Sequence, residues 1–275
     1  MKEKQTDNSG FVRIGRQGGP VELEYVRVGP LPSPGAPVVV FLHEGLGSVS
    51  MWRDFPQRFC ETHGLAGVAF SRFGYGRSTP RPRDQALMPD YLQRQAHDAL
   101  PAFLAALGIE RPWLFGHSDG GSIALLYAAR FPQAVSGIVV AAPHIFVEDI
   151  TIAGIRAVRE AYESTAGEPG GLRQRLARHH ADVDSVFYGW NDAWLNPAFR
   201  AWNIEDELPR IACPILALQG ERDEYGTLEQ IHGIARRNPR TAVHALPDCS
   251  HSPHRDAPDM LIALAGDFMR KQQTA

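Results

Sequence analysis

Gly116-His117-Ser118-Asp119-Gly120, a stretch of the form G-x-S-x-G, decides the fold prediction for this chain. Before it, residues 111–115 are short, apolar and aromatic-rich, as in a buried strand, and after it residues 121–130 have the pattern of a helix. The turn between such a strand and helix is so tight that side chains two positions either side of the serine would collide, and glycine removes them. The stretch therefore predicts a strand–turn–helix unit that exposes the Ser118 hydroxyl at the start of a helix.

Two later strand ends supply the groups that an exposed serine needs in order to become a nucleophile. Asp223 follows the Pro-containing apolar run 213–220, and His251 follows the strand-like run 241–247. A serine is a weak nucleophile unless a histidine takes its proton and a carboxylate orients that histidine. The chain order Ser, Asp, His is that of α/β-hydrolases and differs from the order of the chymotrypsin and subtilisin types.

The chain resembles the α/β-hydrolase superfamily, and in particular its small capped members, which include bacterial esterases and meta-cleavage-product hydrolases. This resemblance implies an α/β fold with a mostly parallel eight-stranded sheet, helices on both faces and a helical cap. It also implies Ser118 as the nucleophile, His251 as the general base, Asp223 as the orienting acid, and no cofactor. It covers nearly the whole chain and rests on five motifs in the expected order, Phe41-Leu42-His43-Glu44-Gly45-Leu46-Gly47-Ser48, Ser71-Arg72-Phe73-Gly74-Tyr75-Gly76-Arg77-Ser78, the G-x-S-x-G stretch, Gly220-Glu221-Arg222-Asp223 and Cys249-Ser250-His251-Ser252-Pro253-His254.

The composition is that of one large globular domain. The chain has 275 residues, 44% of them hydrophobic, and its net charge is only −3, so no nucleic-acid or membrane partner is expected. The polar start of the chain, residues 1–8, does not have the pattern of a signal peptide, and no run of 18 apolar residues predicts a membrane span. Three widely spaced cysteines predict neither a disulfide framework nor a zinc site, which favours a reducing cytoplasm.

Strands and helices are predicted to alternate along most of the chain, as in a parallel sheet covered on both faces. The alternation stops over residues 144–208, which carry amphipathic helical patterns and three of the five tryptophans. The sequence therefore predicts an α/β-hydrolase core over 1–143 and 209–275 and a helical cap insertion over 144–208. Strands are predicted at 37–42, 66–70, 113–115, 135–141, 215–218 and 242–246, and helices at 90–107, 121–130, 227–237 and 257–270.

The acid and the base each have rivals in the sequence. His254 lies three residues after His251 and is a second candidate for the base, and the His-x-x-His spacing also suits a metal site. No carboxylate or third histidine at ligand spacing supports a metal, so none is predicted. Glu221 and Glu224 flank Asp223, and Glu148 or Asp149 would supply the acid if it came from the preceding strand end.

Acyl chemistry also needs two hydrogen-bond donors for the oxyanion. The backbone amide of Asp119 is one candidate, and the loop 43–47 should supply the other, from Gly45 or else Leu46. The family usually has His-Gly at the start of this loop, whereas this chain has Glu44 after the histidine. Glu44 is predicted either to point away from the oxyanion site or to be neutralised, with Arg72 or Arg77 as its partner. The alternative is a functional Glu44 that is protonated or positions the deacylating water.

Further candidates for the substrate pocket are Arg72, His144, Trp190 and Trp194, together with Glu44. Arg72 is expected either to face the pocket or to pair with a carboxylate. His144 has two interpretations, a substrate contact or a hydrogen-bonded structural histidine. The cap aromatics either pack the cap onto the core or line the pocket.

These features predict a serine hydrolase that acts on a small-molecule carboxylic ester. Because the nucleophile is a serine rather than an aspartate, the epoxide-hydrolase and dehalogenase branches are disfavoured. The alternatives are a carbon–carbon hydrolase of aromatic ring-fission products, a thioesterase and a non-catalytic receptor on the same fold. The natural ester and the oligomeric state, a homodimer included, are left open by the sequence.

Overall fold

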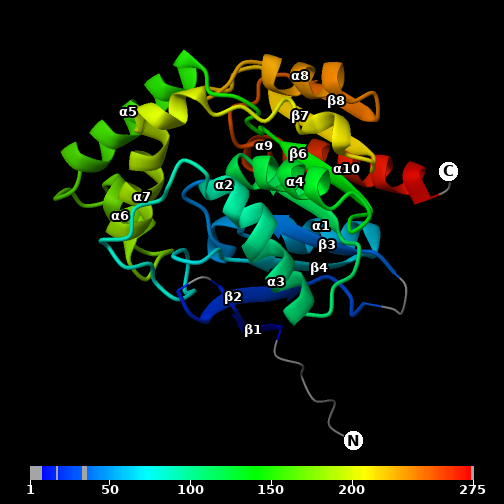
Figure 1. Ribbon diagram of the computed structural model, residues 1–275, viewed down its shortest axis with the longest axis horizontal. Coiled ribbons are helices and arrows are strands. Elements are labelled where there is room, and N and C mark those ends of the chain that lie inside the picture. Colours follow the sequence, from blue (N-terminus) through cyan, green and yellow to red (C-terminus); the bar gives the residue numbers. More distant parts are fainter. Residues whose placement is uncertain (1–7, 17, 33–35, 274–275) are drawn as a thin grey trace, which may run out of the picture.

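The computed structural model describes residues 8–16, 18–32 and 36–273, so most of the polar start of the chain lies outside it. Eight strands form one sheet in the order β1-β2-β4-β3-β5-β6-β7-β8. The pairs from β4 to β8 are parallel, and β2 is antiparallel to both neighbours, which confirms the predicted α/β fold (Figure 1). The strands are β1 (Ser9–Ile14), β2 (Val21–Val28), β3 (Val38–Leu42), β4 (Ala66–Phe70), β5 (Trp113–His117), β6 (Gly137–Ala141), β7 (Ile215–Gly220) and β8 (Thr241–Leu246).

Helices cover both faces of the sheet, and alternate side chains of its strands belong to two different hydrophobic cores. Phe41 packs on the face covered by α1 and α10, while Val40 and Leu42 pack on the opposite face, beneath α3, α4 and α8. Continuous apolar strands fit this arrangement because both of their faces are buried. The helices of the core are α1 (Phe55–His63), α2 (Tyr91–Arg94), α3 (Leu100–Ala106), α4 (Asp119–Arg130), α8 (Glu229–Arg237), α9 (Pro253–Asp256) and α10 (Pro258–Gln273), with a 3₁₀ turn η1 (Val49–Trp52).

The helix predicted over 90–107 forms in three parts. The π-helical stretch η2 (Gln95–Ala99) joins α2 to α3, so the helix continues with one widened section. The other predicted helices and strands appear within a few residues of their expected ends.

Residues 144–208, called the cap below, contain helices and no strand, and lie at one end of the sheet (Figure 1). A single β-bridge joins Phe146 to Asn203, and the amide of Ile204 donates to the carbonyl of Ile145 at 2.8 Å. The entrance and exit of the cap therefore lie side by side, between β6 and β7. Its helices are α5 (Asp149–Ser164), α6 (Leu172–Leu176) and α7 (Val183–Leu195), with the 3₁₀ turns η3 (Pro197–Ala201) and η4 (Leu208–Arg210).

Candidate active site

Ser118 lies in a strained turn between β5 and α4. Its φ of 52° and ψ of −118° place a non-glycine residue in a region that side chains disfavour. A Cβ at Gly116 would collide with the backbone of Gly120, and a Cβ at Gly120 would collide with the carbonyl of Leu42. The two glycines of the motif are therefore required for the sharp turn that brings the serine to the carboxyl end of the sheet.

The structure brings the three predicted residues of the triad into one hydrogen-bonded series. His251 Nε2 lies 2.9 Å from Ser118 Oγ, and His251 Nδ1 lies 2.8 Å and 2.9 Å from the two carboxylate oxygens of Asp223. With Nδ1 protonated and held by the carboxylate, Nε2 is free to accept the serine proton. The arrangement is that of a nucleophile, a general base and an orienting acid.

The Asp223 carboxylate is held in place by two more donors. Gln219 Nε2 donates to Oδ2 at 3.0 Å, and the amide of Tyr225 donates to Oδ1 at 2.8 Å. Burial by itself would raise the pKa of Asp223, but the hydrogen bond and charge of His251 outweigh it and leave that pKa below its ordinary value. Asp223 is therefore ionised when His251 accepts a proton.

The rival acids have other partners. Glu148 accepts hydrogen bonds from Thr227 and Gln230, and Asp149 pairs with Arg200. Glu224 lines the cavity beside the triad, where its carboxylate accepts a hydrogen bond from the backbone amide of His251 at 3.1 Å. Neither Glu148 nor Asp149 thus takes the place at the imidazole that Asp223 occupies.

His254 is buried behind the triad. Its ring centroid lies 4.9 Å from that of Trp52 and 4.7 Å from that of His117, and burial holds its pKa well below the ordinary value. A neutral ring packed among aromatic groups is a structural arrangement. In the described part of the chain, no group of three His, Cys, Asp or Glu residues is placed to hold a metal ion.

The loop 44–47, called the oxyanion loop below, is held from beneath through the carbonyl of Glu44. This carbonyl accepts hydrogen bonds from His43 Nδ1 at 2.7 Å, from Arg72 Nη2 at 2.8 Å and from the amide of Gly47 at 3.1 Å. The N–H of Gly45 belongs to the same planar trans peptide and points the opposite way. Among the described residues, neither this amide nor that of Asp119 donates to a protein acceptor, so both suit the role of oxyanion donor.

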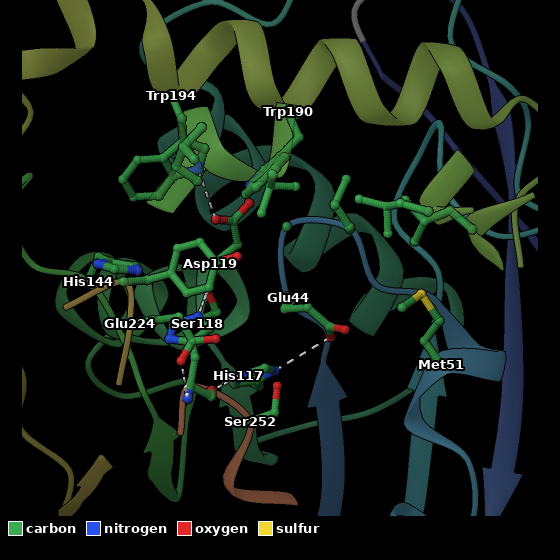
Figure 2. A pocket seen from close by; sticks show the side chains of 18 residues that line it. Glu44, Met51, His117, Ser118, Asp119, His144, Trp190, Trp194, Glu224 and Ser252 are labelled. Atoms are coloured by element: carbon green, nitrogen blue, oxygen red, sulfur yellow. Dashed lines mark hydrogen bonds and ion pairs between the residues drawn. The ribbon is translucent and has the colours of Figure 1, made fainter. Parts of the chain in front are cut away.

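The predicted partners of Glu44 were wrong. Arg77 pairs with Glu24 at 2.7 Å, and Arg72 gives the loop only its hydrogen bond to the backbone carbonyl. The Glu44 carboxylate instead lies 3.6 Å from His117 Nδ1, as Figure 2 shows, and 3.6 Å from Arg255 Nη2. Burial would raise its pKa, but the proximity of His117 holds it well below the ordinary value, so Glu44 is an anionic group in the wall of the cavity.

Arg72 also does not line the cavity, which corrects one of the two predictions for it. Its guanidinium is buried 3.4 Å from the carboxylate of Asp119, which also accepts from Tyr91 Oη at 2.8 Å and Trp194 Nε1 at 3.3 Å. Asp119 therefore joins the nucleophile turn to the cap, a role that the sequence prediction of an amide donor missed. The position directly after the nucleophile is buried in this fold, and a buried charge needs a partner. The presence of a charged residue at this position could therefore have indicated such a network.

A cavity of about 260 Å³ opens beside Ser118 between the core and the cap. Trp190 and Trp194 reach into it from α7, and His144 closes it on the triad side, as Figure 2 shows. Burial is the main cause that lowers the pKa of His144 to about 3, so its ring is neutral. The cavity also has an aliphatic wall that was not predicted, which consists of Leu46, Met51, Ile155, Val158, Leu172 and Leu176. Of these, only Ile155 and Val158 follow a helical i, i+3 pattern, in α5, that marks an apolar face.

Residues 37–168 match the family model described as "alpha/beta hydrolase fold". The chain has the α/β-hydrolase fold, and this match supports its membership of the α/β-hydrolase superfamily. Human "Serine hydrolase BPHL" is 28% identical over 74% of this chain and 69% of its own length. The 2-hydroxy-6-oxo-6-phenylhexa-2,4-dienoate hydrolase of Burkholderia cepacia is 22% identical over 96% of this chain and 97% of its own.

The fold also matches solved structures over nearly its whole length. The proline iminopeptidase of Mycobacterium smegmatis superposes with a TM-score of 0.76 and 21% identity, covering 96% of this chain and 98% of that protein. These findings make the protein an α/β-family hydrolase and leave its substrate open. In the part of the chain that the structure describes, no helix is long and apolar enough to cross a membrane.

Proposed function

We propose that this protein is a serine hydrolase that cleaves a small carboxylic ester through an acyl-enzyme on Ser118. The observation that carries the proposal is the series Ser118–His251–Asp223, with contacts of 2.9 Å and 2.8 Å, at the floor of a mainly apolar cavity. Without a metal or cofactor step, these groups suffice for acyl transfer to serine and then to water. A cytoplasmic location stays a prediction from the sequence.

The proposed reaction has two halves. Ser118 Oγ attacks the ester carbonyl as His251 Nε2 takes its proton, and the amides of Gly45 and Asp119 stabilise the resulting oxyanion. The carbon–oxygen bond to the alcohol breaks, and the alcohol leaves with the proton from His251. Water then gives a proton to His251 and attacks the acyl-enzyme, and Ser118 recovers its proton as the acid is released.

The size and wall of the cavity favour a small apolar acyl or alcohol group. Its volume of about 260 Å³ lies below the range of about 300–1,000 Å³ that is typical of sites for drug-sized ligands. Met51 lies on the side of the cavity beyond Glu44, away from His144 (Figure 2), and Leu172 and Leu176 belong to the same hydrophobic cluster as Met51. A hydrophobic chain would therefore extend from the carbonyl at Ser118 toward Met51.

The charges around the cavity separate the ester from the ring-fission alternative. The carboxylates of Glu44 and Glu224 are in its wall, and none of the described residues lining it is a lysine or arginine. A dienoate such as that named for the Burkholderia cepacia relative carries a carboxylate. Like charges about 4 Å apart cost roughly 4 kcal/mol at an effective dielectric constant near 20, so a neutral ester is the better fit. The same argument disfavours the phosphates of a coenzyme A thioester.

Labelling with a fluorophosphonate probe and a substrate panel would test this proposal. The panel compares p-nitrophenyl acetate, butyrate and hexanoate with a ring-fission dienoate and L-prolyl anilide, and Ser118→Ala is the control. We expect labelling of the wild type alone and ester kcat/KM at least about tenfold above that for the other substrates, with Ser118→Ala reduced about 10⁴–10⁶-fold. Labelling with faster dienoate cleavage would favour the carbon–carbon hydrolase, and absence of both labelling and turnover would favour a receptor.

A further inference from the structure

We propose that His180, in the cap, is a positioning residue for the oxyanion loop. Its ring joins two core loops: Nε2 lies 2.9 Å from the carbonyl oxygen of Leu46, and Nδ1 accepts the amide of Gly76 at 3.0 Å. A carbonyl can only accept and an amide can only donate, so these partners fix the neutral imidazole with its proton on Nε2. The inference rests on the proposed function, because the proposed function assigns a catalytic amide to the oxyanion loop.

The oxyanion loop has one anchor from the core and one from the cap. Beneath it, Arg72 and His43 hold the carbonyl of Glu44. Two residues later, His180 holds the carbonyl of Leu46 from the cap side. The amide of Gly45 shares its peptide plane with the first anchored carbonyl and precedes the second by one residue, so the two anchors together limit its movement.

The part of the cap that carries His180 is itself attached to the core. The amide of Ala181 donates to the carbonyl of Gly76 at 2.9 Å, and His179 Nδ1 lies 2.8 Å from Ser50 Oγ. Gly76 thus accepts from the backbone next to His180 and donates to its ring. These contacts fix the position of the imidazole, which is 7% exposed, before any substrate is present.

The electrostatic surroundings keep this ring in the form that the two hydrogen bonds require. Burial is the largest cause that lowers the pKa of His180, to about 4, with a further lowering from His179, while Glu44, Glu24 and the hydrogen bond to Leu46 act in the opposite direction. At neutral pH the ring is therefore uncharged, and Nδ1 keeps the lone pair that accepts from Gly76.

The position of Gly45 also depends on the cap from above. A Cβ at residue 45 would collide with the indole of Trp190, so the glycine backbone lies directly against α7. An oxyanion donor works because it is already in place when charge develops, and removal of one such donor costs about 10²–10³ in kcat. Release of one anchor leaves the donor present but less well placed, so a smaller loss in kcat is expected, with little change in KM.

Two amide substitutions separate the anchor on Leu46 from the attachment to Gly76. In His180→Asn the side-chain oxygen takes the place of Nδ1 and accepts from Gly76, but no donor reaches Leu46. In His180→Gln the side-chain nitrogen takes the place of Nε2 and donates to Leu46, but Gly76 loses its acceptor. Each variant loses one hydrogen bond, so a merely structural role predicts equal losses of Tm and of activity for the two.

Steady-state kinetics on a p-nitrophenyl ester, with Tm measured for each variant, decides between these outcomes. We expect His180→Asn to lower kcat about tenfold or more at nearly constant KM, and His180→Gln to stay within about threefold of the wild type. Ser50→Ala, which removes a cap-to-core hydrogen bond that does not reach the loop, is the control and should leave kcat unchanged.

Equal kcat in the Asn and Gln variants, or a larger loss in the Gln variant, would overturn the inference. If the Asn variant does not fold, the Gln variant decides alone: near-wild-type kcat with lowered Tm supports the anchor, and a tenfold loss refutes it. A wild type without esterase activity or fluorophosphonate labelling would instead refute the proposed function, so the two failures can be distinguished.

Discussion

The floor and the roof of the cavity are built in different ways. The floor consists of Ser118, Asp223 and His251, which follow β5, β7 and β8 directly in the chain or after a short turn. The roof consists of the oxyanion loop and the cap, whose contacts join segments far apart in sequence, such as His180 with Leu46 and with Gly76. Strand order therefore places the floor, whereas a few side-chain hydrogen bonds place the roof.

The largest effect is expected from loss of the general base, His251, in the floor of the cavity. His251→Ala should lower kcat/KM for esters about 10⁴–10⁶-fold, because the triad works as a unit and the serine loses its proton acceptor. His254→Ala is the matched control, since its ring packs on Trp52 and does not reach Ser118. It should lower Tm and leave most of the activity. A silent His254→Ala enzyme beside an active His251→Ala enzyme would reverse the assignment of the base.

The floor was predictable from sequence for a local physical reason. Each triad residue comes soon after an apolar run, and the carboxyl ends of parallel strands meet at one edge of the sheet. Once the runs before Ser118, Asp223 and His251 are identified as neighbouring parallel strands, their side chains must gather there. The glycines of the G-x-S-x-G stretch mark the strained turn at Ser118 because a Cβ at either position would collide with backbone atoms.

The roof was less predictable because its contacts do not follow from any period in the sequence. The helical character of 144–208 was evident, yet the partner of Glu44 depends on where His117 and Arg255 meet in space. The buried pair of Arg72 with Asp119 depends likewise on two loops that only the folded sheet brings together. Aliphatic wall residues such as Met51 were missed because single apolar side chains carry no signal that separates a pocket from a core.

Lowering the pH from neutral to about 4 should weaken the attachment of the roof to the core. The pKa of His180 falls from 6.5 in its ordinary state to about 4 in the fold, so the unfolded chain binds more protons between these values. Its contribution to stability is thus complete above pH 6.5 and is lost as the pH falls through about 4. A shift of this size is worth about 3 kcal/mol.

Urea unfolding at pH 7 and pH 4, for the wild type and His180→Gln, measures this contribution. Between pH 7 and pH 4 the stability of the wild type relative to His180→Gln should fall by about 3 kcal/mol, because Gln does not titrate. The other buried histidines, such as His43 and His144, are common to both proteins and cancel in the comparison. A difference that is constant with pH would show that the fold does not hold the imidazole neutral.

Glu44 tests whether the roof selects substrates by charge. Glu44→Gln should leave kcat for a neutral ester within about threefold, while the ratio of kcat/KM for a carboxylate-bearing ester to that for its neutral analogue rises about tenfold or more. Stability should fall by about 1 kcal/mol through loss of the ion pair with Arg255. A native Tm with a hundredfold loss of kcat for the neutral ester would instead make Glu44 part of the catalytic apparatus.

The smallest effect is expected from substitution of tryptophans in the cap. Trp190 and Trp202 differ in their position relative to the cavity. Trp190 lines the cavity, whereas Trp202 donates to Gln93 at 3.3 Å outside it. Trp190→Ala should enlarge the site and move the preferred ester toward longer chains, by about fourfold in kcat/KM for each methylene that finds new apolar contact, since burial of one methylene is worth about 0.8 kcal/mol. Trp202→Ala, of equal volume change, should lower stability and leave the chain-length profile of p-nitrophenyl esters in place. If both variants shifted the profile equally, the cap would be acting through its overall packing on the core, and the distinction between a roof that contacts substrate and one that only covers it would fail.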